Sequence, residues 1–266
     1  MAQSKFVIEP SNGWWGIAKE GFEEELLKEL RKKELQKKNY QGVHSMILNT
    51  TNQCNMDCIY CSASENRSEE KMPEEVAKKV IDEAVKLELT PRIVFHGSEP
   101  LLNMPLIEST VAHGEAQERD VLFYVQSNLT TLTDEKLAFI RDHQIGVSTS
   151  IDGFAEQHNT TRPFRGGLPS YNQIVENMGR VLKFQDGMCT ATVVTKYNVG
   201  DIGEIALDLE KRGVTHIQFL PSVKCSDADE DFRPTNDVLT RGYINLFEQT
   251  FRRMESGEQT AVIKNI

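Results

Sequence analysis

Residues 43–61 read Val-His-Ser-Met-Ile-Leu-Asn-Thr-Thr-Asn-Gln-Cys-Asn-Met-Asp-Cys-Ile-Tyr-Cys. The start of this stretch is largely apolar and predicts a β-strand, and Cys54, Cys58 and Cys61 follow it on one short loop. Thiolates are the usual protein ligands of iron–sulfur clusters, including the [4Fe–4S] type. Three thiolates leave one iron of such a cluster open to another ligand, and an open metal position is a place for chemistry. The spacing therefore indicates a reactive cluster.

A zinc site is the alternative, with His44, His96 or Cys225 as the fourth ligand. Zinc ligands usually come in paired spacings, and the chain has no second close pair of cysteines, so the cluster is favoured. Cys189 begins an apolar run, and we expect it to be a buried core residue. The odd number of cysteines is a poor disulfide framework and indicates a reduced, cytoplasmic protein.

Short apolar runs alternate with helical patterns after residue 43, which predicts βαβ units and a parallel sheet. Pro73 and Gly213 mark one helix start and one helix end. Six units are too few to close an eight-stranded barrel, so we expect an α/β fold, a partial (β/α)6 TIM-like barrel over residues 43–266. The expected strands are 43–48, 92–96, 121–126, 145–151, 190–195 and 215–220. The expected helices are 73–88, 103–117, 133–142, 171–185, 201–212 and 236–255.

Residues 1–42 are expected to form a separate β-hairpin plus helix. Strands are predicted at 5–9 and 13–18, and a helix from about 22 to 38. We expect this element to pack on the barrel, and a role in engaging a peptide remains the alternative.

Composition narrows the class of protein. A formal net charge of −10 argues against nucleic acid as a partner. No apolar run approaches the ~20 residues of a membrane span, and the N-terminus has no secretory h-region. The sequence thus favours a cytoplasmic protein with neither a nucleic-acid nor a membrane partner.

Polar clusters directly follow five of the expected strands. In parallel α/β folds the active residues gather at the carboxyl ends of strands, so we expect these clusters to meet at one rim. They are the cysteine loop, His96 to Pro100, Gln126 to Asn128, Ser150 to Gly153, and Leu220 to Ser222.

With these residues the chain resembles the radical S-adenosylmethionine (SAM) superfamily. The run from Cys54 to Cys61 matches its cluster motif, including the aromatic Tyr60 before the last cysteine. The chain is further similar to anaerobic sulfatase-maturating and related peptide-modifying enzymes. That similarity rests on Phe95 to Leu101, Gln126 to Asn128, Ser150 to Gly153 with His158 and Arg162, and Gln218-Phe219.

The resemblance implies an oxidoreductase-type enzyme in which the three cysteines hold a [4Fe–4S] cluster and SAM chelates its open iron. One electron then cleaves a carbon–sulfur bond of SAM, and the resulting 5′-deoxyadenosyl radical abstracts a hydrogen from the substrate. It also implies a peptide or protein substrate and an electron donor such as flavodoxin or ferredoxin.

The same resemblance implies a SAM-binding set. The segment Gly97-Ser98-Glu99 would offer carbonyls to the SAM ammonium, although the family pattern has glycine where Ser98 stands. Arg162 would pair with the SAM carboxylate, with Arg165 as its rival. Tyr60 and Val193 would flank the adenine. Hydrogen bonds to the ribose and the methionine end would come from Ser127, Asn128, Ser150 and Asp152.

Several questions stay open at this level. For the substrate, the resemblance favours sulfatase maturation or ribosomal-peptide modification. The alternatives are a truncated or non-catalytic cluster- or peptide-binding module, and an enzyme acting on a small metabolite. Relatives usually carry a cysteine-rich extension called SPASM, and too few cysteines follow Cys61 for one here, so we expect a core cut from a longer enzyme. Candidates for a general base are Asp227, Asp229 and Asp231, with an acidic solvated loop as the simpler interpretation.

Overall fold

The computed structural model describes residues 4–8, 15–19, 24, 28, 45–64, 67–87, 91–222, 231–258 and 260–264. The chain divides into two compact units, Met1–Val43 and His44–Ile266. In the first unit, β1 (Ser4–Ile8) pairs antiparallel with β2 (Trp15–Lys19). Apart from residues 24 and 28, the helix expected over 22–38 lies outside the described residues.

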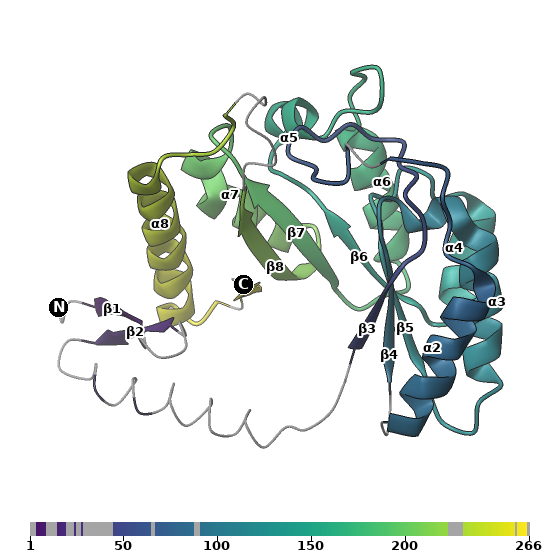
Figure 1. The fold of residues 1–266 in the computed structure, drawn as a ribbon. Coiled ribbons are helices and arrows are strands. Elements are labelled where there is room, and N and C mark those ends of the chain that lie inside the picture. The colour runs from purple at the N-terminus through teal and green to yellow at the C-terminus, as the bar shows by residue number, and fades with distance from the viewer. Residues whose placement is uncertain are drawn as a thin grey trace. The chain divides into compact units, whose positions relative to one another are not determined.

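The second unit is built on a seven-stranded sheet in which every neighbouring pair of strands is parallel and the strands follow chain order (Figure 1). The expected parallel α/β architecture of an open partial barrel is therefore confirmed. The strands are β3 (Ser45–Asn49), β4 (Arg92–His96), β5 (Leu122–Gln126), β6 (Gly146–Ser150), β7 (Met188–Val194), β8 (Val214–Pro221) and β9 (Val262–Lys264).

Helices connect these strands. The α-helices are α2 (Glu74–Leu87), α3 (Met104–Glu115), α4 (Asp134–Asp142), α5 (Ala155–Thr161), α6 (Tyr171–Val181), α7 (Ile202–Lys211) and α8 (Asn236–Glu255). The 3-10 helices are η1 (Pro100–Asn103) and η2 (Val199–Asp201). One strand and one α-helix were not expected, β9 and α5. The sheet therefore has seven strands rather than six, because residues 262–264 pair with β8.

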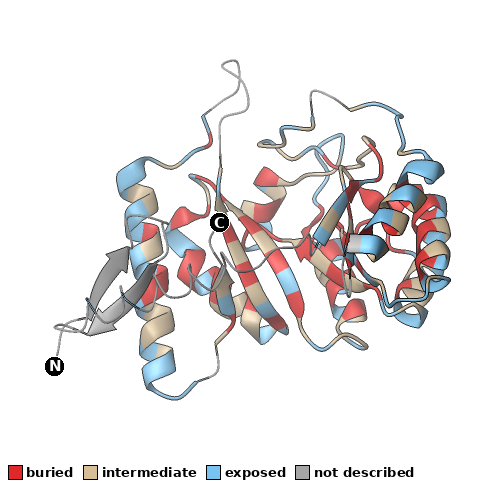
Figure 2. Cartoon of the chain, turned by 60° about the horizontal axis from the view of Figure 1, so that its bottom comes forward, coloured by how far each residue is buried: buried red, intermediate tan, exposed pale blue. Residues whose placement is uncertain are grey.

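One face of the sheet makes the core. Along β4, Ile93 and Phe95 are fully buried while Arg92 and His96 are exposed, the alternation of a strand with one covered face. The helices contribute buried apolar residues one turn apart to this core, such as Ile81 and Ala84 on α2. Figure 2 shows the resulting alternation of buried and exposed positions along the strands.

The opposite, inner face of the sheet is uncovered within the described chain. Ile47 is 66 % exposed and Val262 is 51 % exposed, whereas a closed barrel would fill its interior with such side chains. Cys189 belongs to this face. Its expected burial in the core is wrong, because Met188 and Thr190 take the buried positions of β7 and Cys189 points the other way, where it is exposed.

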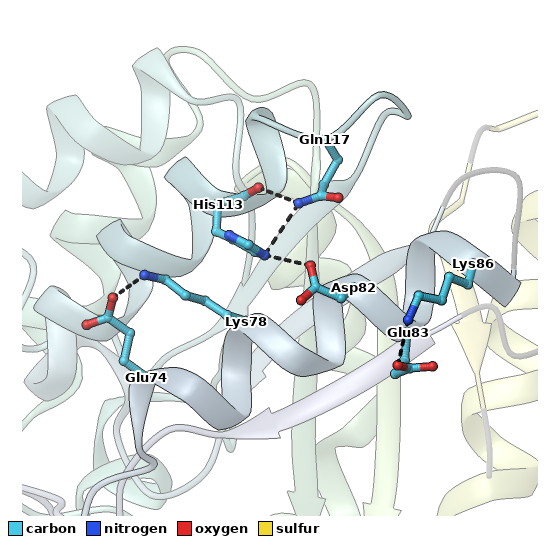
Figure 3. A network of polar contacts seen from close by, with 7 residues as sticks. All are labelled: Glu74, Lys78, Asp82, Glu83, Lys86, His113 and Gln117. Atoms are coloured by element: carbon cyan, nitrogen blue, oxygen red, sulfur yellow. Dashed lines mark hydrogen bonds and ion pairs between the residues drawn. The ribbon is translucent and has the colours of Figure 1, made fainter.

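Polar contacts on the surface join α2 to α3 (Figure 3). The imidazole Nε2 of His113 on α3 lies 2.8 Å from the Asp82 carboxylate on α2. The pair Glu74 and Lys78 forms within α2. Exposed ion pairs contribute only about 0–1 kcal/mol each, so the apolar packing between these helices and the sheet dominates their placement.

Candidate active site

The carboxyl ends of the strands surround a cavity of about 310 Å³. All three cysteines of the loop line it, together with groups from β4 to β8. The other expected cofactor-binding residues that line it are Tyr60, Gly97, Ser98, Ser127, Asn128, Ser150, Arg162 and Val193. The fold thus brings together side chains that are spread over about 140 positions of the sequence. Glu99 and Asp152 do not line this cavity and lie beneath its wall.

The cysteine loop is held by hydrogen bonds to the last residue of α5 and to the segment that follows it. The backbone N–H of Asp57 donates to the Pro163 carbonyl at 2.8 Å, and that of Ile59 donates to the Thr161 carbonyl at 3.0 Å. Met56, which is 1 % exposed, is buried beneath the loop. Backbone pairing therefore fixes the cysteine loop beside the cavity that its thiols line.

Two of the thiols, those of Cys54 and Cys58, have a raised pKa. Burial raises the pKa of Cys54, and burial raises that of Cys58 to about 11, although the Arg162 charge acts in the opposite direction. Metal binding must therefore displace protons from these groups. Among the described residues, no three His, Cys, Asp or Glu side chains converge on a place for one ion. Thiolates that bind different irons of a cluster have no need to converge, so the donor set fits a cluster better than zinc.

Glu99 locks two strand-end segments together from below. It is fully buried, and its carboxylate accepts hydrogen bonds from the Ser127 hydroxyl at 2.7 Å and from the Asn128 and Leu101 backbone N–H groups at 2.8 and 3.1 Å. Burial raises the pKa of Glu99 in spite of these donors. Its carboxylate is fully used by the protein, so Glu99 positions Ser127 and Asn128 in the cavity wall.

The backbone at position 97 leaves no room for a side chain. Its φ is +114°, and a Cβ at this position would lie 2.9 Å from the Thr51 carbonyl oxygen. The neighbouring N–H groups of Ser98 and Glu99 donate to the Thr51 and Gln53 carbonyls at 3.2 and 2.9 Å. The loop after β4 therefore lies directly against the start of the cysteine loop, and only glycine permits that approach.

Asp152 is the centre of a second buried network. Its carboxylate, which is 0 % exposed, accepts from the Tyr60 hydroxyl at 2.5 Å, the Thr161 hydroxyl at 2.9 Å and the Val193 N–H at 3.0 Å. The Tyr60 hydroxyl in turn accepts from Arg162 Nη1 at 2.6 Å. Burial raises the pKa of Tyr60 well above its usual range, so this hydroxyl stays protonated. Asp152 thereby fixes the cysteine loop against β7.

Arg162 places an unused donor beside the thiols. Its Nε is buried and has no hydrogen-bond partner within the described chain. Burial opposes its charge, but the Cys58, Tyr60 and Asp152 groups outweigh that effect and hold the pKa of Arg162 well above its usual value. A buried polar group without a partner is costly, so this N–H indicates a ligand acceptor. The rival Arg165 is exposed and does not line the cavity.

Two supporting residues had no assigned role in the sequence. Asn198 donates through Nδ2 to the carbonyls of Asp152 and Val193, both at 2.8 Å. His158 is fully buried and accepts the Asp152 N–H at its Nδ1, at 3.2 Å, and burial lowers its pKa to about 3. His158 appeared among the segments of the resemblance, whereas Asn198 lay in a polar loop with no signal.

The acidic residues after β8 are only partly described. Asp231 accepts from the Arg233 side chain at 2.9 Å on the surface, which matches the simpler interpretation of a solvated acidic loop. Asp227 and Asp229 lie outside the described residues, as do His44 and Cys225.

Fold and site together define an open α/β barrel protein with three cysteine thiols gathered at the carboxyl rim of a parallel sheet. Comparison with known proteins narrows this class. The model of the radical SAM superfamily matches residues 48–209. An uncharacterized protein of Methanocaldococcus jannaschii is 33 % identical over 180 residues, which are 67 % of this chain and 62 % of that protein. The chain therefore belongs to the radical SAM superfamily.

The chain also spans less than two thirds of the length of relatives and solved structures with named activities. The serine-type anaerobic sulfatase-maturating enzyme of Bacteroides thetaiotaomicron is 29 % identical over 200 residues, 68 % of this chain and 46 % of that enzyme. The solved structure of anSMEcpe with bound AdoMet and Cp18Cys peptide has a TM-score of 0.74 at 18 % identity, covering 82 % of this chain and 62 % of that one. Streptococcus suis SuiB bound to the precursor peptide SuiA has a TM-score of 0.66 at 13 % identity, covering 92 % and 54 %. At such low identity these structures show the common fold.

Membership of the family also identifies the cofactors, a [4Fe–4S] cluster and SAM. The residues present fit both groups. Three thiols at one cavity suit the cluster, and the unpartnered Nε of Arg162 suits an anionic group of the nucleoside cofactor. Across the described segments, no helix combines the length and apolar character needed to cross a bilayer.

Proposed function

We propose that this chain is the core of a radical SAM enzyme that modifies a side chain of a peptide or protein by hydrogen abstraction. The observation that carries the proposal is the single cavity in which three thiols, the unused Arg162 N–H and the polar strand ends meet. Similarity to sulfatase-maturating enzymes and to a precursor-peptide-binding protein supports the class of substrate. The units Met1–Val43 and His44–Ile266 are proposed as the N-terminal hairpin element and the catalytic core.

Within the cavity, Cys54, Cys58 and Cys61 would hold the cluster. The bound cluster and SAM supply a one-electron cleavage that yields the hydrogen-abstracting radical. Arg162 would bind the SAM carboxylate, because a guanidinium suits a planar anion in a water-poor site. The remaining direct contacts to SAM are proposed for Tyr60, Gly97, Ser98, Ser127, Asn128, Ser150 and Val193.

Glu99 and Asp152 would act on SAM indirectly, through the residues that they hold in place. Both carboxylates are fully buried and already accept three hydrogen bonds each from protein groups. We therefore assign them the task of holding Ser127, Asn128, Tyr60 and Val193 in place. This assignment refines the expectation that they bind the cofactor directly.

The inner face of the sheet supports a neutral, peptide-like substrate. Near the rim it presents amides, hydroxyls and an imidazole, from Gln126, Gln218, Ser150 and His96. Farther down it becomes apolar, with Leu122, Tyr124 and Ile47 exposed. Histidines aside, Arg92 at the amino end of β4 is the one charged residue that strands β3 to β8 place on this face. The amides near the rim could pair with the backbone of a peptide, which supports a peptide as the substrate.

Anaerobic reconstitution with iron and sulfide, followed by dithionite and SAM, tests the core of the proposal. We expect 5′-deoxyadenosine from the parent chain and from Cys189→Ala, whose thiol is exposed on the inner face away from the loop. We expect loss of both iron and 5′-deoxyadenosine in Cys58→Ala. A parent chain that is fully loaded with cluster yet forms no 5′-deoxyadenosine would show a non-catalytic binding module instead.

A further inference from the structure

His96 is the last residue of β4, and its side chain lines the cavity of about 310 Å³ at the strand ends. The backbone N–H and the hydroxyl of Thr50 both donate to the His96 carbonyl, at 2.9 and 3.1 Å. Phe95 takes the buried position before it, so the imidazole belongs to the inner face of the sheet. A fixed strand end therefore presents an imidazole to the cavity, and side chains on such elements are placed more precisely than those on loops.

Carboxylates are the common alternative to histidine as proton acceptors, but within the described chain none lines this cavity. Glu99 and Asp152 lie beneath its wall, where each already accepts three hydrogen bonds from protein groups. Of the three aspartates expected as candidates for a general base, Asp231 bonds to Arg233 on the surface, and the other two lie outside the described residues. The described carboxylates therefore supply no base at the cavity.

The remaining titratable groups at this cavity have other tasks or the wrong protonation state. The three thiols are proposed as cluster ligands. The Tyr60 hydroxyl donates to Asp152 at 2.5 Å and stays protonated, because burial raises its pKa well above the usual range. Arg67 and Arg162 are cations, and a guanidinium has no acceptor nitrogen. Among the described residues around the cavity, His96 is therefore the group that can take up a proton near neutral pH.

The imidazole of His96 is neutral and is not occupied by the described residues. Burial lowers its pKa from 6.5, and no hydrogen bond or neighbouring charge within the described chain adds to or opposes that effect. One ring nitrogen of a neutral imidazole accepts a hydrogen bond. Gln126, at the end of the neighbouring strand β5, is by contrast already used. Its amide oxygen accepts from the Ser148 hydroxyl at 2.5 Å, and its amide nitrogen donates to the Ser150 hydroxyl at 3.3 Å. A substrate in the cavity would thus meet an available acceptor at His96.

We propose that His96 is the proton acceptor of the reaction, and that its imidazole binds the polar hydrogen on the atom next to the reacting carbon of the substrate. The inference rests on the proposed function. The step balances as follows. The carbon–hydrogen bond breaks and its hydrogen atom passes to the 5′-deoxyadenosyl radical. The substrate radical then loses one electron to an oxidised iron–sulfur cluster and one proton to the imidazole, and a double bond forms between the carbon and the neighbouring atom.

The yield of oxidised peptide per 5′-deoxyadenosine tests the proposal. The full chain with its cluster receives SAM, dithionite and the Cp18Cys peptide that the related anSMEcpe structure contains. Mass spectrometry measures peptide that has lost two hydrogen atoms, and chromatography measures 5′-deoxyadenosine. We expect His96→Gln to lower the ratio of the two products about tenfold or more. The matched control is His143→Gln, which removes a surface imidazole that pairs with Glu115 and should leave the ratio unchanged.

Imidazole added to His96→Ala gives a second measurement, because a base from solution can replace a lost base but cannot repair a structural defect. We expect imidazole to raise the product ratio severalfold in His96→Ala and to leave it unchanged in His143→Ala.

Equal product ratios in His96→Gln and His143→Gln would overturn the proposal. So would a loss of 5′-deoxyadenosine in His96→Gln that matches the loss of oxidised peptide, because His96 would then serve SAM. A parent chain that forms 5′-deoxyadenosine without oxidising the peptide would overturn the role of His96 and leave SAM cleavage standing. A fully loaded parent chain without 5′-deoxyadenosine would overturn the proposed function itself.

Discussion

Replacing Tyr60 by phenylalanine should destabilise the cluster-free protein by about 2–4 kcal/mol. The hydroxyl donates to the buried Asp152 carboxylate at 2.5 Å and accepts from Arg162 Nη1 at 2.6 Å. Hydrogen bonds to charged groups contribute about 1.5–3 kcal/mol each, and the two bonds are lost together. Asp152 keeps its bonds from Thr161 and Val193, which places the total below the sum of two full losses.

Urea unfolding followed by circular dichroism measures this difference, because the midpoint shifts at constant m when only stability changes. Tyr124→Phe is the control, since Tyr124 is 36 % exposed on the inner face and its hydroxyl has no described hydrogen bond. It should change stability by less than about 0.5 kcal/mol. A Tyr60→Phe variant as stable as this control would refute the idea that Tyr60 bridges two buried charges. A coupling energy near zero in the cycle with Asp152→Asn would refute it independently.

Three further predictions follow from the same networks. Burial lowers the pKa of His158 from 6.5 to about 3, so the unfolded state binds more protons than the folded state below pH 6.5. The free energy of unfolding should therefore fall as the pH falls from 6.5 toward 3, by up to about 1.4 kcal/mol per pH unit. The variant His158→Gln should show a flatter pH profile of urea midpoints than the parent. Gly97→Ala should lower the free energy of unfolding by about 2–4 kcal/mol, because the φ of Gly97 is +114° and the new Cβ would clash with the Thr51 carbonyl. The control Gly166→Ala has open space around it and should cost only about 1 kcal/mol. Thermal melts measure both. Glu99→Ala should lower the free energy of unfolding by about 3 kcal/mol or more, because three buried donors lose their acceptor. It should also weaken SAM binding, measured by equilibrium dialysis. Full SAM affinity in this variant would argue against the positioning role of Glu99.

Periodicity explains why the strands and most helices could be predicted. Residues 92–96 alternate buried and exposed side chains, and α8 has the expected bounds, because a pattern of 2.0 or 3.6 residues is visible locally. The unexpected elements have no such pattern. β9 has three residues, and the seven residues of α5 read Ala-Glu-Gln-His-Asn-Thr-Thr, with no apolar stripe. Both exist because neighbouring parts of the fold supply their partners.

The side on which a residue lies was harder to predict than the element that contains it. Cys189 sits in a strand as expected, yet it is exposed, because the sheet remains open on its inner face. The alternation of side chains along a strand assigns successive residues to opposite faces of the sheet, but it does not predict which face is covered. That depends on how many strands close the barrel and on what packs inside it.

The cluster motif, the parallel α/β class and the rim at which the polar segments gather could all be predicted from the amino-acid sequence. This was possible because ligand spacing and hydrophobic periodicity are local, and because parallel strands bring their carboxyl ends to one edge. The hydrogen-bond partners of the two carboxylates depend on the tertiary structure: Glu99 meets donors 28 and 29 residues away, and Asp152 meets a hydroxyl 92 residues away. Contacts at such separations arise from the packing of whole elements. Among the described residues, the same packing leaves the Nε of Arg162 without a hydrogen-bond partner beside the thiols.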